Sequence, residues 1–347
     1  MIYKVENFPS RQVTTQNKKF LYFGGTAYLG LQTDKNFQEI FINSIKKYGT
    51  NYGASRKANI QLTIYEEVEN YLANFIGSEG CITLSSGFLA GQLVAKYFRS
   101  KNRKCFYAPS THEALHLLNT KNHTTYNELI NSINNFVETS NENPVLFIDS
   151  IQLNGRNYPD FDWLQKINLQ RITLVIDDSH GFGIIGENGS GAYSLLSKLN
   201  PKKLLVCGSM GKGFGIQAGF IAGNKTDIKK IQLTHMYAAA SPATPAAMAT
   251  IIASEKIINE KRRILLENVQ LFITKIANLK QFKFLPNYPC FAFENKKLAN
   301  YLESNKILIT NFYYPKESGD LVLRIVLNSN HTKKDILKLT DLINKFS

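Results

Sequence analysis

A lysine set among glycines is the residue of this sequence best suited to chemistry. Lys212 lies within residues 211–215 (GKGFG), soon after the apolar run 204–207 (LLVC). The glycines offer its stem nothing bulky to pack against, and they cost backbone entropy on folding. Such an amine suits a Schiff base with an aldehyde cofactor, whereas a solvated loop lysine would explain Lys212 if it stood alone. Its partners decide between the two.

An acid and a histidine follow the preceding apolar run. Asp177 comes directly after residues 172–176 (ITLVI), and His180 lies three positions later. A pyridoxal phosphate enzyme needs a carboxylate against the pyridinium nitrogen, because the protonated ring then withdraws electrons from the substrate. Asp177 fits that role and His180 could bond the phenolic oxygen; the plainer alternatives are a capping carboxylate and a turn histidine. We expect these groups and Lys212 at strand ends, where open α/β sheets bind ligands.

A serine-glycine turn could receive a phosphate group. Ser86, Gly87 and Phe88 join an apolar run to a helical pattern, so free backbone N–H groups and the helix dipole would meet an anion there. On this segment alone, an ordinary capped helix start is the better interpretation. Ser209, three residues before Lys212, could give a hydroxyl to the same phosphate.

An arginine interrupts an apolar stretch near the C-terminus. Arg324 stands within residues 321–327 (LVLRIVL), and a guanidinium in such a strand needs an anionic partner. A substrate carboxylate and a structural Asp or Glu are equally good partners.

Two glycine-rich stretches imitate nucleotide-binding motifs but lack their context. Residues 181–186 match the GxGxxG spacing, yet four polar residues separate them from the apolar run and further glycines follow. That fingerprint should begin at a strand end and open a helix. Gly213 follows Lys212 where a P-loop requires Ser or Thr. We therefore expect no nucleotide site in either stretch.

Short apolar runs alternate with amphipathic segments through the middle of the chain. This alternation predicts an α/β fold with a doubly wound, mostly parallel sheet. Helical periodicity follows several of the runs and is clearest from Phe88 to Phe98. The candidate strands are residues 81–84, 144–148, 174–176 and 204–207.

We expect three parts along the chain. Residues 1–44 form an N-terminal arm, residues 45–248 a large cofactor-binding domain, and residues 249–347 a small α+β domain. 

The expected small domain begins with a charged amphipathic helix, at about 251–279. Its candidate strands are 290–293 and 321–327, and Thr332 is expected to cap the last helix with Asp335 at the third helical position.

The composition of the 347 residues, 44% hydrophobic and 20% charged, is that of a soluble globular protein. No apolar run approaches the ~20 residues that span a bilayer, and the N-terminus lacks the apolar core of a signal peptide. The scattered cysteines have no metal-binding spacing, so we expect reduced packing residues, no metal site and a cytoplasmic protein. They are Cys81, Cys105, Cys207 and Cys290.

The net charge of +14 raises the alternative of a nucleic-acid-binding or regulatory protein without catalysis. The lysines are spread along the chain, and the densest run, residues 261–263, falls on the expected helix 251–279. No zinc-finger, RNP or homeodomain pattern accompanies it, so we expect no nucleic-acid partner. A basic surface would also attract an anionic substrate such as a coenzyme A thioester.

Taken in order, the motifs resemble the α-oxoamine synthases. These are fold-type I pyridoxal phosphate enzymes that include 8-amino-7-oxononanoate synthase, 2-amino-3-ketobutyrate CoA ligase, 5-aminolevulinate synthase and serine palmitoyltransferase. The resemblance covers nearly the whole chain. The matching segments are 28–31 (YLGL), 48–56, 86–88 (SGF), 177–181 (DDSHG), 186–189 (GENG), 211–215 and 331–336.

The resemblance implies the cofactor, pyridoxal 5'-phosphate, and the roles of the site residues. Lys212 would form the Schiff base, Asp177 would contact the pyridine nitrogen, and His180 the phenolic oxygen. His112 would stack on the cofactor ring, although read alone it is more often a surface histidine, and Arg324 would bind the amino-acid carboxylate.

The resemblance also implies an acyltransferase that condenses an amino acid with an acyl thioester and releases carbon dioxide. Members of the family are homodimers with the site at the interface, so Ser241 or Thr244 could reach a phosphate in the partner subunit. An aminotransferase or an aldolase-type lyase on the same fold is the alternative. The substrate is left open by a shorter N-terminal arm, by Thr26-Ala27 before the YLGL motif, and by Tyr52 in the glycine-rich segment.

Overall fold

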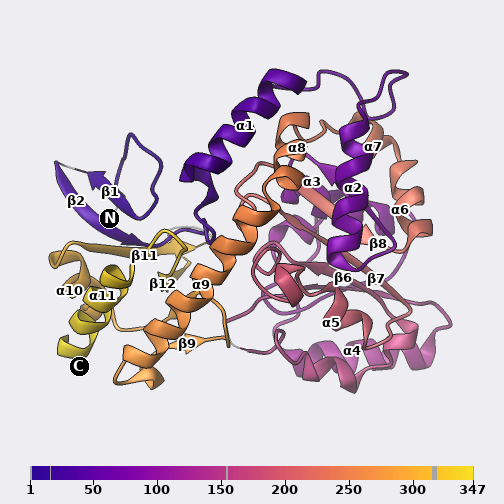
Figure 1. The fold of residues 1–347 in the computed structure, drawn as a ribbon. Helices are drawn as coiled ribbons and strands as arrows, with labels where there is room; N and C mark the ends of the chain where they lie inside the picture. The colour runs from indigo at the N-terminus through magenta and orange to yellow at the C-terminus, as the bar shows by residue number, and fades with distance from the viewer. Residues whose placement is uncertain (1, 16, 154, 315–318, 347) are drawn as a thin grey trace. The chain divides into compact units, whose positions relative to one another are not determined.

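The computed structural model divides the chain into two compact units (Figure 1). It describes residues 2–15, 17–153, 155–314 and 319–346. The first unit comprises Met1–Gln38, Leu153–Gly155 and Lys256–Ser347, and the second comprises Glu39–Gln152 and Arg156–Glu255.

A six-stranded sheet in the order β3-β8-β7-β6-β5-β4 organises the second unit. Strands β4 to β7 pair in parallel, and only β8 runs antiparallel to its neighbours β3 and β7. Each predicted strand of this region is found, and the alternation of strands and helices along the chain is that of a doubly wound fold. The bounds are β3 Gly80–Leu84, β4 Cys105–Tyr107, β5 Val145–Asp149, β6 Thr173–Asp177, β7 Lys203–Ser209 and β8 Gly219–Gly223.

Both faces of this sheet are covered. Phe147 and Val175 point to a core that includes Leu93 of α3 (Gly87–Arg99), while Leu146 and Leu174, on the opposite face, are also fully buried. Strands buried on both faces read as continuous apolar runs rather than as alternating ones, which is why the runs were recognisable in the sequence. The other helices of this unit are α2 Thr63–Ile76, α4 Tyr126–Thr139, α5 Tyr193–Ser197, α6 Lys225–Gln232, α7 His235–Ala239 and α8 Pro245–Ala253.

Two glycines bring the start of α3 against the ends of β7 and β8. A Cβ atom on Gly87 would lie 2.6 Å from the backbone nitrogen of Ser209, and one on Gly219 would lie 2.1 Å from the carbonyl oxygen of Ser86. No side chain fits in either gap. The turn at Ser86 and Gly87, the candidate phosphate site, therefore lies directly against the end of β7 at Ser209.

The sheet of the first unit has the order β1-β2-β11-β12-β10-β9. Its pairings are antiparallel except for that between β2 and β11, so the N-terminal residues supply two strands of this sheet. The predicted strands near 290 and 321 are confirmed as β10 and β12. The elements are β1 Gln12–Thr15, β2 Lys18–Phe23, β9 Lys283–Phe284, β10 Cys290–Ala292, β11 Ile307–Tyr314, β12 Asp320–Val326, α10 Lys296–Ser304 and α11 Lys333–Phe346.

The predicted helix at about 251–279 was wrong at its start. Two helices occupy this region, α8 ending at Ala253 and α9 spanning Glu255–Lys275. Ser254 lies between them with φ −103° and ψ 9°, outside helical geometry.

The predicted cap of the C-terminal helix is confirmed. The Thr332 N–H donates to Asp335 Oδ2 at 2.7 Å, and the Asp335 N–H donates to Thr332 Oγ1 at 3.3 Å. Arg11 donates from Nε and Nη2 to the same carboxylate, at 2.6 and 2.9 Å. Next to the cap, burial lowers the pKa of His331 to about 4. The motif at residues 331–336 therefore has a structural role in this unit: it caps α11, and the His331 imidazole beside the cap is neutral.

Candidate functional site

The predicted cofactor-site residues all belong to the second unit, at the carboxyl ends of its parallel strands. Asp177 ends β6, Ser209 ends β7, and Ser86 lies between the end of β3 and the start of α3. Lys212 and His180 follow in the loops after β7 and β6. This is the edge at which open α/β sheets bind ligands. 

Arg324 lies on β12 of the first unit, where it pairs with Ala292 and Thr310. Among the described residues, no carboxylate lies within ion-pairing distance of its half-buried side chain. The structural Asp or Glu partner considered for Arg324 is therefore absent from the described part of the chain.

The Lys212 amine lies among titratable groups of the two central strands. Its Nζ atom is 3.0 Å from Nε2 of His180. Burial lowers the pKa of Lys212, while the charges of Asp177 and Asp149 act in the opposite direction. A lysine of lowered pKa holds more of the neutral amine near neutral pH, and the neutral amine is the form that attacks an aldehyde or accepts a proton.

Asp177 presents one carboxylate oxygen to the site. Its Oδ1 accepts a hydrogen bond from the Ser179 N–H at 2.9 Å, and its Oδ2 lies 4.0 Å from Nδ1 of His112. That imidazole nitrogen already accepts the Ala114 N–H at 3.1 Å, so it does not donate to Asp177. Among the residues that the structure describes, no donor lies within hydrogen-bonding distance of Asp177 Oδ2. The oxygen can therefore receive a donor from a ligand, such as a pyridinium N–H.

The start of α3 offers backbone donors to an anion. Ser86 caps the helix, its Oγ accepting from the Leu89 N–H at 3.1 Å. The N–H groups of the first helical turn have no partner within the helix, so those of Gly87 and Phe88 point out of it. Ser209 Oγ accepts from the Gly211 N–H at 3.1 Å and keeps its own hydroxyl proton to donate. Phe88 is 58% exposed.

These groups fit pyridoxal phosphate in three separate respects. Lys212 supplies a half-buried amine for the aldehyde, Asp177 supplies an acceptor for the ring nitrogen, and the helix start at Gly87 supplies donors for the phosphate. The close approach of Gly87 to Ser209 leaves no room for a side chain between the start of α3 and the end of β7. Within the part of the chain that the structure describes, no group of three or more His, Cys, Asp or Glu residues could hold a metal ion.

One acidic residue of the site was missed in the sequence. Asp149 ends β5 and stands opposite Asp177 in the parallel pairing of β5 with β6. Its Oδ1 accepts a hydrogen bond from the backbone N–H of His112 at 3.1 Å. The only local signal was that Asp149 ends an apolar run, as Asp177 does.

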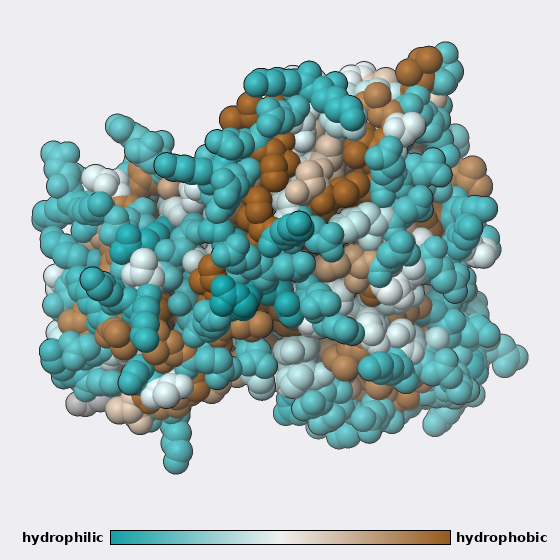
Figure 2. All heavy atoms as spheres, in the orientation of Figure 1, coloured by the Kyte–Doolittle hydropathy of each residue, from teal (hydrophilic) through white to brown (hydrophobic). Residues whose placement is uncertain are grey.

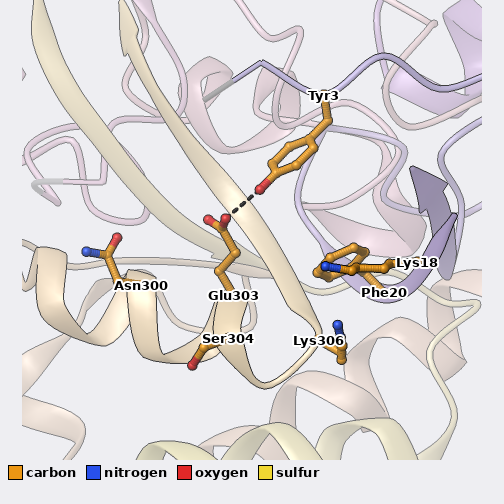
Figure 3. Close-up of a pocket in the computed structure, with 7 residues that line it drawn as sticks. All are labelled: Tyr3, Lys18, Phe20, Asn300, Glu303, Ser304 and Lys306. Carbon is orange, nitrogen blue, oxygen red and sulfur yellow. Dashed lines mark hydrogen bonds between the residues drawn. The ribbon is translucent and has the colours of Figure 1, made fainter. Parts of the chain in front are cut away.

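A separate cavity of about 450 Å³ lies in the first unit (Figure 3). There the Tyr3 hydroxyl donates to Glu303, and burial together with this carboxylate raises the pKa of Tyr3 to about 12. Two ammonium groups, of Lys18 and Lys306, lie at its rim. None of the predicted site residues lines this cavity.

Comparison with known proteins assigns the chain to a family. Residues 26–343 match the profile described as Aminotransferase class I and II. The 8-amino-7-oxononanoate synthase of Petrotoga mobilis is 25% identical over 96% of this chain and 89% of its own length. The serine palmitoyltransferase of Bacteriovorax stolpii is 24% identical over 96% of this chain and 83% of its own length.

A solved structure shows the same architecture. Serine palmitoyltransferase from S. paucimobilis with bound PLP superposes with a TM-score of 0.81 at 18% identity, covering 99% of this chain and 91% of that one. The likeness confirms the fold-type I architecture expected from the sequence. No described helix is both long enough and apolar enough to traverse a bilayer. With the profile match spanning nearly the whole sequence, the chain belongs to the class I and II aminotransferase family.

Proposed function

We propose that this chain is a pyridoxal phosphate-dependent acyltransferase that condenses an amino acid with an acyl thioester and releases carbon dioxide. The observation that carries the proposal is the half-buried Lys212 amine, 3.0 Å from His180 and in the electrostatic field of Asp177. The relatives named 8-amino-7-oxononanoate synthase and serine palmitoyltransferase support the reaction class. 

The bound cofactor supplies an electron sink for a carbanion at the α-carbon of the amino acid. In the proposed mechanism, Lys212 would hold the cofactor, and its amine, when free, would accept the α-proton of the amino acid, since its lowered pKa favours the neutral form. Asp177 would hold a proton on the ring nitrogen, and His180 would donate to the phenolic oxygen. His112 would pack against one face of the ring and exclude water from it.

The remaining predicted residues hold the ends of the ligands. The N–H groups of Gly87 and Phe88 and the hydroxyls of Ser86 and Ser209 bind the phosphate. Arg324 binds the carboxylate of the amino acid, which is supported by the lack of a described carboxylate partner for its guanidinium. 

Product analysis tests the reaction. The purified protein is incubated with single amino acids and acyl-CoA thioesters, and we expect free thiol, carbon dioxide and an α-amino ketone in equal amounts. A 2-oxo acid without free thiol would favour an aminotransferase, and cleavage of the amino acid without an acyl donor would favour a lyase. A colourless protein with salt-sensitive DNA binding would instead support the basic, non-catalytic alternative.

We also infer a cytoplasmic location, which the free state of all four cysteines supports. Disulfide bonds form in oxidising compartments and are rare in the cytosol.

The expected homodimer is supported by apolar surface on α1 (Lys35–Tyr48). Ile40, Phe41 and Ile45 are partly exposed and Ile42 is 50% exposed, although such residues are favoured inside proteins. Figure 2 shows hydrophobic residues gathered on the surface beside this helix. Exposed apolar area of this kind marks interaction surfaces.

A groove of about 600 Å³ beside α3 adds further apolar surface in the second unit. Phe88 and Leu118 line it and are 58% and 85% exposed. A second copy of the chain would cover both side chains. It would also enclose the proposed cofactor site, which includes Phe88 at the start of α3.

We predict that Leu118→Glu weakens this dimer by at least about tenfold, because it would bury a charge in an apolar contact. Light scattering should give twice the 39.2 kDa chain mass for the unmodified protein and a lower mass for the variant at micromolar concentration. Leu233→Glu is the control, since Leu233 is 77% exposed and lies outside the groove. An equal loss of dimer in both variants, or a monomeric parent, would contradict the inference.

A further inference from the structure

Two aspartates lie side by side at the carboxyl ends of neighbouring strands. Asp149 and Asp177 are opposite each other in the parallel register of β5 and β6. Each lies two residues beyond a side chain of the same core, Phe147 and Val175, so both carboxyl groups extend from the face of the sheet that carries the site.

The surroundings of Asp149 oppose a second negative charge. Although the residue as a whole is half-buried, desolvation of its carboxyl group and the charge of Asp177 raise the pKa of Asp149 well above the usual range. Two adjacent carboxylates in a poorly solvated site do not both ionise readily. The other titratable groups that interact with this pair are Lys212, His112, Tyr126, Cys207 and the neighbouring Asp178.

The same carboxyl group fixes the loop that carries His112. Asp149 Oδ1 accepts the backbone N–H of His112, and the carbonyl group of Asp149 accepts the side-chain amide of Asn157 at 2.5 Å. Trp163 Nε1 in turn donates to Oδ1 of Asn157 at 2.9 Å. Asp149 therefore joins the sheet, the His112 loop and the segment after β5.

We propose that Asp149 and Asp177 hold one proton between them and that Asp149 is a positioning residue for His112. The pair then presents a single negative charge to Lys212, and the titration belongs to the pair rather than to either residue. Only the meaning of His112 for catalysis rests on the proposed function, because the shared proton and the hydrogen bond are properties of the chain itself.

The shared proton predicts a non-additive effect on Lys212. In Asp149→Asn the remaining Asp177 keeps one charge, and in Asp177→Asn the released Asp149 ionises and keeps one charge. Only the double variant loses the charge, which lowers the pKa of Lys212 and increases its neutral fraction. Since one unit of pKa changes that fraction tenfold, the effect can be measured as a rate of amine acylation.

The experiment uses the full chain before cofactor is added, with acylation of Lys212 followed by peptide mass spectrometry at neutral pH. We expect the rate to change less than about twofold in each single variant and to rise about tenfold or more in the double variant. Two independently ionised carboxylates would instead give rises in the single variants whose product equals that of the double variant, which would overturn the shared proton. Asp160→Asn, at an exposed position, is the control.

Hydrogen exchange tests the positioning of His112 separately. Asp149→Asn keeps an acceptor oxygen for the His112 N–H, whereas Asp149→Ala leaves that group without its partner. We expect the His112 amide to exchange about tenfold faster in the alanine variant than in the asparagine variant. Equal exchange would overturn the positioning role. Neither measurement uses substrate turnover, so both can fail or succeed whatever reaction the enzyme catalyses.

Discussion

The Lys212→Ala variant should fold normally, lose its covalent hold on pyridoxal phosphate, and turn over substrate about 10⁴-fold more slowly. The half-buried amine lies 3.0 Å from Nε2 of His180, and alanine leaves no group there to bind the aldehyde or to accept a proton. The visible absorbance of the lysine-bound cofactor, and mass spectrometry after borohydride reduction, measure the loss directly. Steady-state kinetics give the change in kcat.

Lys202→Ala is the matched control for this variant. Lys202 is exposed and lies directly before β7, so its loss removes a positive charge without touching the site. We expect its absorbance and kcat to stay within about twofold of those of the parent. Full activity with visible cofactor absorbance in Lys212→Ala would refute the assignment of Lys212, and with it the proposed mechanism.

The positions of Lys212, Asp177 and Ser86 at strand ends could be predicted from the sequence. Each lies at the end of a strand that is buried on both faces, or within three residues after it. Such strands are apolar runs that can be recognised locally, and ligand-binding groups collect at their carboxyl ends. The helix from Phe88 was predictable for the same reason, since its period of 3.6 residues is also a local property.

Asp149 was not predictable in the same way. It also ends an apolar run, but its role depends on the register of β5 against β6 and on the backbone of His112. Both relations join residues far apart in the sequence, and neither leaves a local pattern. Only the folded sheet shows that this carboxyl group neighbours Asp177.

The start of α8 shows the opposite case, a local signal that was overlooked. Thr244 caps α8 by accepting the Ala247 N–H at 3.4 Å, and Pro245 occupies the first turn. Threonine before proline is a typical helix start, yet the apolar periodicity suggested one helix from about 251. In the structure the Thr244 hydroxyl caps α8; its proposed reach to a phosphate of the partner subunit stays a prediction.

Gly219→Ala should be the most damaging small substitution in the sheet of the second unit. Gly219 stands between Leu84 on β3 and Ser209 on β7, and the new Cβ would lie 2.1 Å from the Ser86 carbonyl oxygen. The obstacle is backbone that begins α3, so neither a rotamer change nor a small shift relieves it. We expect a loss of about 3 kcal/mol of stability, measured as a lower midpoint of urea unfolding.

The same clash should weaken the binding of the cofactor. Relief of the contact requires Ser86 to move, and Ser86 caps the helix whose first N–H groups face the phosphate, so the affinity for pyridoxal phosphate should fall together with the stability. Gly80→Ala is the control, because Gly80 lies on the adjacent β3 and its Cβ would meet nothing closer than the Ile228 side chain at 3.5 Å. Equal destabilisation by both substitutions would mean that strand propensity, and not the contact with Ser86, decides the effect. Destabilisation by Gly219→Ala with unchanged cofactor affinity would instead separate the packing of α3 from the binding of the phosphate.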